Sequence, residues 1–130
     1  MATTTATLTL SSADLTGDAL SLSTTATLTK AGTVTGLDQT TGVGRKTYSS
    51  TSIATLVDKA DYDDDKAHKV YIRNTSTVAT ENIAITVEAQ LLGRLYAGDW
   101  ALLPFNGDQD IKVTPSVSTA LTVEYLVIFE

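Results

Sequence analysis

The chain has no cysteine, and this absence sets the first limits on its function. Without thiols it cannot form a disulfide framework or a thiolate metal site, so its stability must come from packing or from association with other chains. It also has one histidine, two prolines and one tryptophan among 130 residues. A single domain of this length can bury roughly two thirds of the surface that its unfolded chain exposes.

Basic residues are scarce as well. Nine Lys and Arg against fifteen Asp and Glu give a net charge of -6. Binding to nucleic acid or to an anionic membrane surface requires a basic face, so we expect neither partner. No apolar run approaches the ~20 residues of a membrane span, and the N-terminus lacks the basic and apolar regions of a secretion signal.

The motifs of catalysis are also missing. Residue His68, beside Lys66 and Lys69, reads as a surface residue rather than a general base. There is no Gly-x-Ser-x-Gly or His-x-x-x-His, and the glycines between 32 and 44 lack the Gly-Lys-Ser/Thr of a phosphate-binding loop. We therefore expect no enzyme, no catalytic residue, no cofactor and no metal site.

An acidic run at 58–66 offers the one hint of cation binding. Asp61, Asp63 and Asp65 match the first three ligand positions of a calcium loop. The match then fails, because Lys66 stands where Gly is required and Ile72 where a bidentate Glu is required. We expect a solvated turn, with a helical turn at 60–66, and leave adventitious cation binding open.

What the sequence does contain is an alternating pattern of Thr and aliphatic residues. Thr and Ser make up about a quarter of the chain, and β-branched Thr favours strands. Alternation with period 2 predicts strands at 3–10, 20–29, 68–74, 82–90, 110–113 and 121–129, with a less regular one at 47–57. The strand at 121–129 is apolar on both faces, so it should lie centrally or at a subunit contact. The fold class is therefore all-β: an antiparallel β-sandwich or jelly roll of seven to nine short strands with at most one helical turn.

We interpret residues 1–130 as one β domain, with the main sandwich at 45–130. The Gly-rich connection at 31–44 is the best candidate boundary. Two interpretations of the Thr-rich segment 1–44 stay open. It supplies two or three strands of the same sandwich, or it is an arm that pairs with a strand edge of a neighbour, in a swapped arrangement.

The stretch 93–108 holds the only Trp and one of the two Phe, between the turn signals Ala-Gly-Asp and Asn-Gly-Asp. It predicts a short strand from Trp100 to Phe105. Rings in such a stretch are more often core or rim than part of a ligand pocket. Aromatic and Arg side chains dominate interface energetics, so the interface candidates are Arg94, Tyr96, Trp100 and Phe105.

Parts of the second half resemble small virion structural proteins of tailed bacteriophages, those of marine and cyanobacterial phages above all. The resemblance is carried by His-Lys-Val-Tyr-Ile-Arg-Asn at 68–74, Gly-Arg-Leu-Tyr-Ala-Gly-Asp-Trp at 93–100, Pro-Phe at 104–105, Ile-Lys-Val-Thr-Pro-Ser at 111–116 and Val-Glu-Tyr at 123–125. The N-terminal part, with Leu-Asp-Gln-Thr-Thr-Gly at 37–42, is compatible with the same group. These motifs imply a place in a virion, not an active site.

The resemblance implies a capsid cement or decoration protein that staples neighbouring major-capsid subunits. It would be made in the bacterial cytoplasm and sit on the capsid exterior, and its partners would be the major capsid protein and copies of itself as a homotrimer. The alternative is a tail- or fibre-associated module that contacts a tail protein or a host-surface glycan, for which Trp100 with Asp99 could serve.

Overall fold

The computed structural model describes residues 4–15, 17–28 and 37–130, and in them the chain is all-β. One short 3₁₀ helix, η1, covers Lys59–Asp61, and no described helix has the length and apolar character needed to cross a membrane. The strands are β1 (Thr5–Ser12), β2 (Leu20–Thr27), β3 (Gln39–Thr40), β4 (Gly44–Tyr48), β5 (Ala54–Val57), β6 (His68–Asn74), β7 (Asn82–Val87), β8 (Gln90–Tyr96), β9 (Trp100–Phe105), β10 (Ile111–Pro115) and β11 (Leu121–Phe129).

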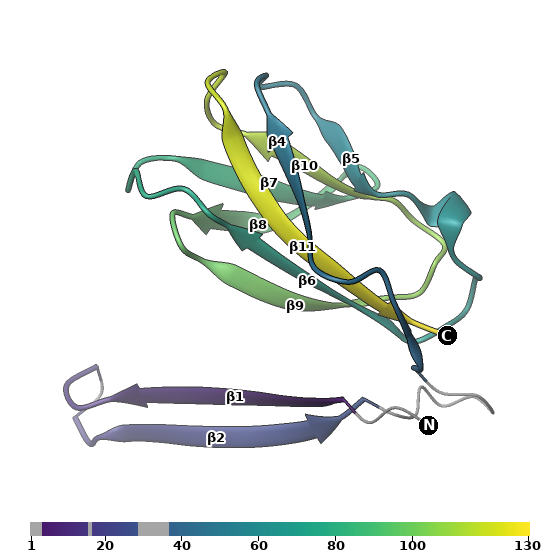
Figure 1. The fold of residues 1–130 in the computed structure, drawn as a ribbon. Coiled ribbons are helices and arrows are strands. Elements are labelled where there is room, and N and C mark those ends of the chain that lie inside the picture. The colour runs from purple at the N-terminus through teal and green to yellow at the C-terminus, as the bar shows by residue number, and fades with distance from the viewer. Residues whose placement is uncertain (1–3, 16, 29–36) are drawn as a thin grey trace.

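Two antiparallel sheets face each other and form the body of the molecule (Figure 1). One has the order β5-β10-β7-β8. The other runs β3-β11-β6-β9, with β4 also paired to β11. The all-β sandwich predicted from the alternation is thus confirmed, and so is the central place of 121–129, since β11 pairs with β6 on one edge and with β3 and β4 on the other.

The core lies between these sheets because alternate residues of each strand point inward. In β6, Val70 and Ile72 are fully buried, while Lys69, Tyr71 and Arg73 occupy the other face. In β11, Val123 and Val127 are fully buried in the same cluster. The sheet that contains β6 and β11 therefore has an inner apolar face and an outer face that carries polar side chains.

There are more strands than the seven to nine expected: eleven among the described residues. The stretch 47–57 divides between β4 and β5, which lie in different sheets. The strand β8 was not predicted. Its start, Gln90-Leu91-Leu92, places two exposed Leu in succession, and the ladder to β7 shifts register between Ile85 and Thr86. A bulge of this kind hides the period of 2 that identifies a strand.

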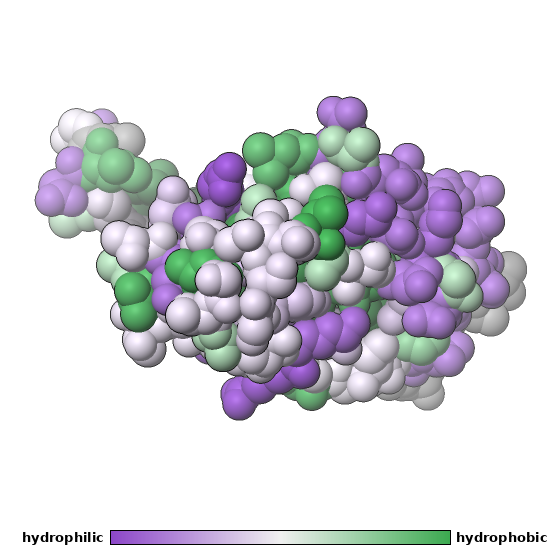
Figure 2. Space-filling view, turned by 90° about the horizontal axis from the view of Figure 1, so that it is seen from above, coloured by the Kyte–Doolittle hydropathy of each residue, from purple (hydrophilic) through white to green (hydrophobic). Residues whose placement is uncertain are grey.

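The first two strands form a hairpin apart from both sheets of the body (Figure 1). Its base packs on the outer face of β11, where Leu28 and Leu37 form a small cluster with Ile128, and Ala6 and Leu126 lie against it. The turn end of the hairpin extends past the body, as both Figure 1 and Figure 2 show. Strands β1 and β2 therefore do not belong to the two-sheet body. The interpretation that this segment supplies strands of the same sandwich is wrong. Part of the 31–44 connection lies outside the described residues.

Candidate interaction surface

The four interface candidates do not share one environment. Trp100 is 51% exposed and Tyr96 47% exposed. Arg94 is exposed as well, and its Nη1 donates to Asn82 Oδ1 at 3.2 Å. Phe105 is only 5% exposed and belongs to the core, so its place among the interface candidates is corrected. The physical reason is parity. Trp100 and Phe105 are five residues apart on one strand, and an odd separation puts two side chains on opposite faces.

The register between β6 and β9 sets which side chains stand beside Trp100. Trp100 lies opposite Arg73, and Leu102 lies opposite Tyr71, all on the outer face of the sheet. This face therefore carries two aromatic rings, a leucine and a guanidinium side by side. Such a combination of flat apolar area with a planar cation is enriched at protein interfaces.

The turn between β8 and β9 holds Tyr96 and Trp100 in fixed positions. Gly98 supplies a φ of 81°, and Asp99 Oδ2 accepts from the Tyr96 N–H at 2.9 Å. The turn is also tied to the end of β6, because the Gly98 N–H donates to the Asn74 carbonyl and the Asn74 N–H to the Asp99 carbonyl, each at 3.0 Å. The carboxylate of Asp99 thus stabilises the turn by accepting the hydrogen bond from Tyr96. The sequence had suggested instead that it could assist Trp100 in binding a glycan.

A polar network borders this face on the side of β11 and β4. Glu124 Oε2 accepts from Arg45 Nη2 at 3.1 Å and from Nε at 3.3 Å, and the Tyr71 hydroxyl donates to Glu124 Oε1 at 3.2 Å. Partial burial raises the pKa of Tyr71, the hydrogen bond and the charge of Glu124 raise it further, and Arg73 acts in the opposite direction. The Tyr71 hydroxyl therefore stays neutral and keeps its role as a donor at ordinary pH.

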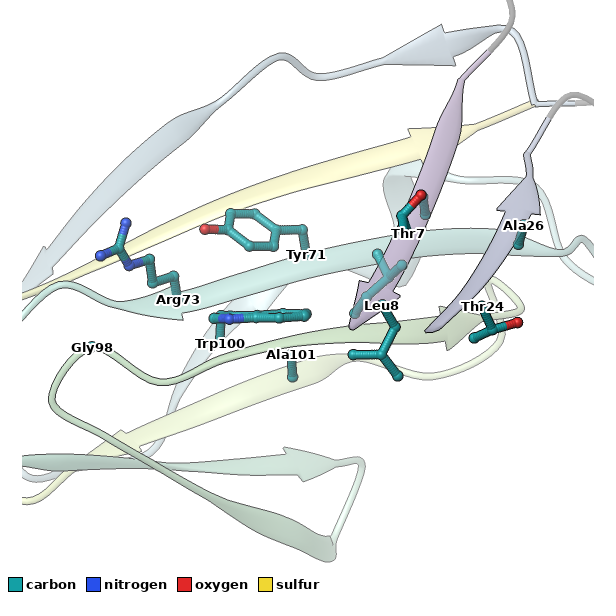
Figure 3. Close-up of a pocket in the computed structure, with 11 residues that line it drawn as sticks. Thr7, Leu8, Thr24, Ala26, Tyr71, Arg73, Gly98, Trp100 and Ala101 are labelled. Atoms are coloured by element: carbon teal, nitrogen blue, oxygen red, sulfur yellow. The ribbon is translucent and has the colours of Figure 1, made fainter. Parts of the chain in front are cut away.

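A groove runs between this outer face and the β1–β2 hairpin, with a volume of about 970 Å³ (Figure 3). In Figure 3 the Trp100 ring and Tyr71 lie on the body side and Leu8 on the hairpin side. The residues that line the groove are Ala6, Thr7, Leu8, Thr24, Ala26, Tyr71, Arg73, Gly98, Trp100, Ala101 and Leu102. Sequence reasoning found Trp100 but not Tyr71 or Leu102. The alternation of β6 carried the signal for Tyr71, because that alternation puts it on the face opposite Val70 and Ile72.

The single histidine lies in the core, so its assignment to the surface was wrong. His68 is fully buried, and its ring contacts Tyr62, Phe105 and Phe129, with centroids 5.7, 5.8 and 6.3 Å away. One ring nitrogen, Nε2, is 3.0 Å from the Asp63 carbonyl oxygen, and Nδ1 has no hydrogen-bond partner among the described residues. The phase of β6 explains the burial: His68 is an even number of residues from Val70 and Ile72, so it shares their inward face.

The acidic run forms a turn, as expected, although its helical part covers Lys59–Asp61 rather than 60–66. Asp58 caps η1, its Oδ1 accepting from the Ala60 N–H at 2.9 Å. Within the described ranges, which include all of 58–66, no three His, Cys, Asp or Glu side chains gather into a group that could hold a metal ion. The arrangement of Asp61, Asp63 and Asp65 therefore adds no support to the partial match with a calcium loop.

The outer surface carries further large apolar side chains on the strands next to Trp100. Leu91 and Leu92 of β8 are 59% and 58% exposed, and Leu102 of β9 is 40% exposed. β8 and β9 are edge strands of the two sheets, connected by the turn at 97–99. Figure 2 shows from above how apolar side chains gather in separate places on the molecular surface. Exposed apolar area at sheet edges is typical of protein contact sites.

Comparison of the chain with protein-family models, with curated proteins and with solved structures found no match.

Proposed function

We propose that the chain is a structural protein of a tailed-phage virion, a cement or decoration protein that staples neighbouring major-capsid subunits on the capsid exterior. The observation that carries the proposal is the exposed apolar edge of the body, where Tyr96, Trp100 and Leu102 lie around a rigid turn. The resemblance of the motifs between 68 and 125 supports the same role. The partners are the major capsid protein and further copies of this chain.

The mechanism of such a protein is mechanical. A contact of standard size buries about 1,600 Å² in total, and several contacts made by one particle-bound assembly reinforce one another. Each contact links two capsid subunits and so opposes the outward pressure of packaged DNA. Exposed aromatic anchors supply most of the binding free energy in such contacts, so Trp100 is the first residue to test.

The test is re-binding of purified protein to particles that lack it. Truncation of a central anchor costs about 2 kcal/mol or more, so Trp100→Ala should weaken binding about thirtyfold or more. The matched control is Ile53→Ala, which removes a side chain of similar exposure, 55%, that does not line the groove. A folded Trp100→Ala variant that binds as well as the control would count against the cement role.

A second candidate function, a tail- or fibre-associated module for a host-surface glycan, draws support from the groove. The Trp100 ring offers a flat face for a sugar, and Arg73 and Tyr71 offer polar atoms beside it (Figure 3). Copy number separates the candidates: hundreds of copies per particle favour cement, and a few dozen or fewer favour the tail. A particle reconstruction that locates this chain would decide between them.

A further inference from the structure

The groove between the hairpin and the body is lined by one cationic side chain and by no carboxylate. Arg73 contributes the positive charge from β6, and every other residue that lines the groove is uncharged. The chain as a whole has a net charge of -6. The groove therefore has a charge of the opposite sign to that of the chain, so it favours an anionic ligand.

The charge of Arg73 is not matched by a carboxylate of the protein. Four residues stand in one row across the outer face of the sheet, each opposite the next: Arg45, Glu124, Arg73 and Trp100. Both carboxylate oxygens of Glu124 are already hydrogen-bonded, Oε2 to Arg45 and Oε1 to the Tyr71 hydroxyl. Arg73 is exposed and forms no ion pair with any residue that the structure describes. The row holds two guanidinium groups and one carboxylate, so one positive charge is left for a ligand.

The wall on the body side restricts the kind of ligand. This wall is the outer face of β6 and β9, whose backbones are paired with each other. An extended peptide binds by adding to a free strand edge, whereas a sheet face offers only side chains. Recognition here must therefore come from side chains. The half-exposed ring of Trp100 and the polar groups of Tyr71, Arg73 and Thr24 are the means that the groove provides (Figure 3).

We propose that the groove binds a saccharide that carries a carboxylate, as a uronic acid does, with the carboxylate on Arg73 and a sugar ring on Trp100. A guanidinium and a carboxylate pair through two parallel hydrogen bonds, and this geometry orients the ligand. Side chains that lie directly opposite on paired strands are about 5 Å apart, so Arg73 and Trp100 can contact one sugar unit together. The groove volume of about 970 Å³ lies within the range of about 300–1,000 Å³ typical of ligand sites.

The proposal rests on the second candidate function, glycan binding, and adds to it the acidic class of the glycan. It is independent of the cement role, because the purified protein alone should show it. The row of side chains also explains which residue carries the selectivity. Trp100 would contact a neutral and an acidic sugar alike, whereas Arg73 distinguishes between them.

The test uses two probes that differ only in charge, an oligomer of galacturonic acid and its methyl ester. Because Trp100 is the only tryptophan of the chain, its fluorescence reports binding in the groove. The acid should bind at least about tenfold more tightly than the ester, since the ester cannot form the ionic pair with Arg73. Equal affinities for the two probes would overturn the acidic class and leave glycan binding standing. Binding of neither probe would overturn both.

A pair of variants shows whether Arg73 is the source of this preference. Arg73→Gln should lower the affinity for the acid about tenfold or more and leave the affinity for the ester unchanged. The matched control is Arg94→Gln, which removes the same charge from an exposed Arg that does not line the groove. Equal losses in the two variants would assign the preference to the overall charge of the chain and overturn the proposal.

A second pair of variants tests the wall that the hairpin supplies. Thr24 lines the groove on the hairpin side, so Thr24→Asp places a carboxylate there and should weaken binding of the acid several-fold by repulsion. Ser23→Asp, at the preceding residue, is the control, because Ser23 is exposed but does not line the groove. Equal affinities of the two variants for the acid would contradict a ligand held between the hairpin and the body.

Discussion

The hairpin and the two-sheet body share one sequence pattern and reach different outcomes. Both alternate aliphatic residues with Thr or other polar residues, and both form antiparallel strands. In the body a second sheet covers the apolar face, so Val70 and Ile72 have no exposure, whereas the comparable Leu10 of the hairpin is 47% exposed. Alternation thus determines that a segment is a strand and which residues share a face. It does not determine whether another layer lies on that face.

The largest expected difference between the two regions concerns truncation of an apolar side chain. Ile72→Ala should lower the free energy of unfolding by about 2–5 kcal/mol, because it leaves a cavity between two sheets. Leu22→Ala, in dilute protein, should cost less than about 1 kcal/mol, because its side chain is 43% exposed and leaves no closed cavity. Urea unfolding measures both. Similar losses for the two variants would show that the hairpin belongs to the same cooperative core.

A pair of glycines sharpens the comparison at the level of the backbone. A Cβ at Gly107, where φ is +90°, would lie 2.2 Å from the Asp63 carbonyl oxygen, while a Cβ at Gly17 of the hairpin turn would have nothing within 4 Å. Gly107→Ala should therefore cost about 2–4 kcal/mol, from strain and from displacement of the acidic turn. Gly17→Ala should stay within about 0.5 kcal/mol of the parent. Thermal unfolding of the two variants measures the contrast, and a mild Gly107→Ala would mean that the turn at 62–66 moves easily.

The smallest expected effect is a loss of stability at alkaline pH. It concerns the body alone, because the hairpin contains no tyrosine. Burial raises the pKa of Tyr48, and the nearby Tyr125 raises it further. Because the folded state favours the neutral phenol, the contribution of Tyr48 to stability is fully present below its unfolded pKa of about 10 and is lost as pH rises through the folded value. The loss of stability above pH 10 should be smaller in Tyr48→Phe than in the parent.

At neutral pH the same variant should cost less than about 1 kcal/mol or be slightly stabilising, because the Tyr48 hydroxyl is buried without a hydrogen-bond partner among the described residues. Urea unfolding at pH 7 and above pH 10 provides both readings. An unchanged alkaline loss in Tyr48→Phe would assign the effect to Tyr62 or Tyr71, whose pKa values burial also raises.

Much of the fold could be predicted from the sequence because its longest strands alternate without interruption. Residues 68–74 and 121–129 matched β6 and β11, and the doubly apolar pattern of the latter indicated its central place. Strand β8 escaped prediction because Leu91 and Leu92 break the alternation beside a register shift. Strand order and the separation of the hairpin depend on contacts between distant residues, which a local pattern does not encode.

The candidate surface was predictable in part. The residue type alone identifies Trp100 as a candidate. Phe105 is also aromatic and lies on the same strand, but strand parity places it on the opposite, buried face. The Lys residues next to His68 favour a surface position. Its parity with Val70 and Ile72 favours the core, and the structure places it there. Tyr71 and Leu102 joined the surface only through the pairing of β6 with β9.

The central place of β11 has a consequence for biosynthesis. Leu121–Phe129 pairs with β6, β4 and β3, which are separated from it by tens of residues along the chain. A ribosome must therefore release nearly all of this sequence before the five-stranded sheet can form. Until then, the strand edges that pair with β11 are unpaired in the nascent chain. Chaperone demand during translation should be concentrated in that interval, after β6 has emerged and before β11 has followed it.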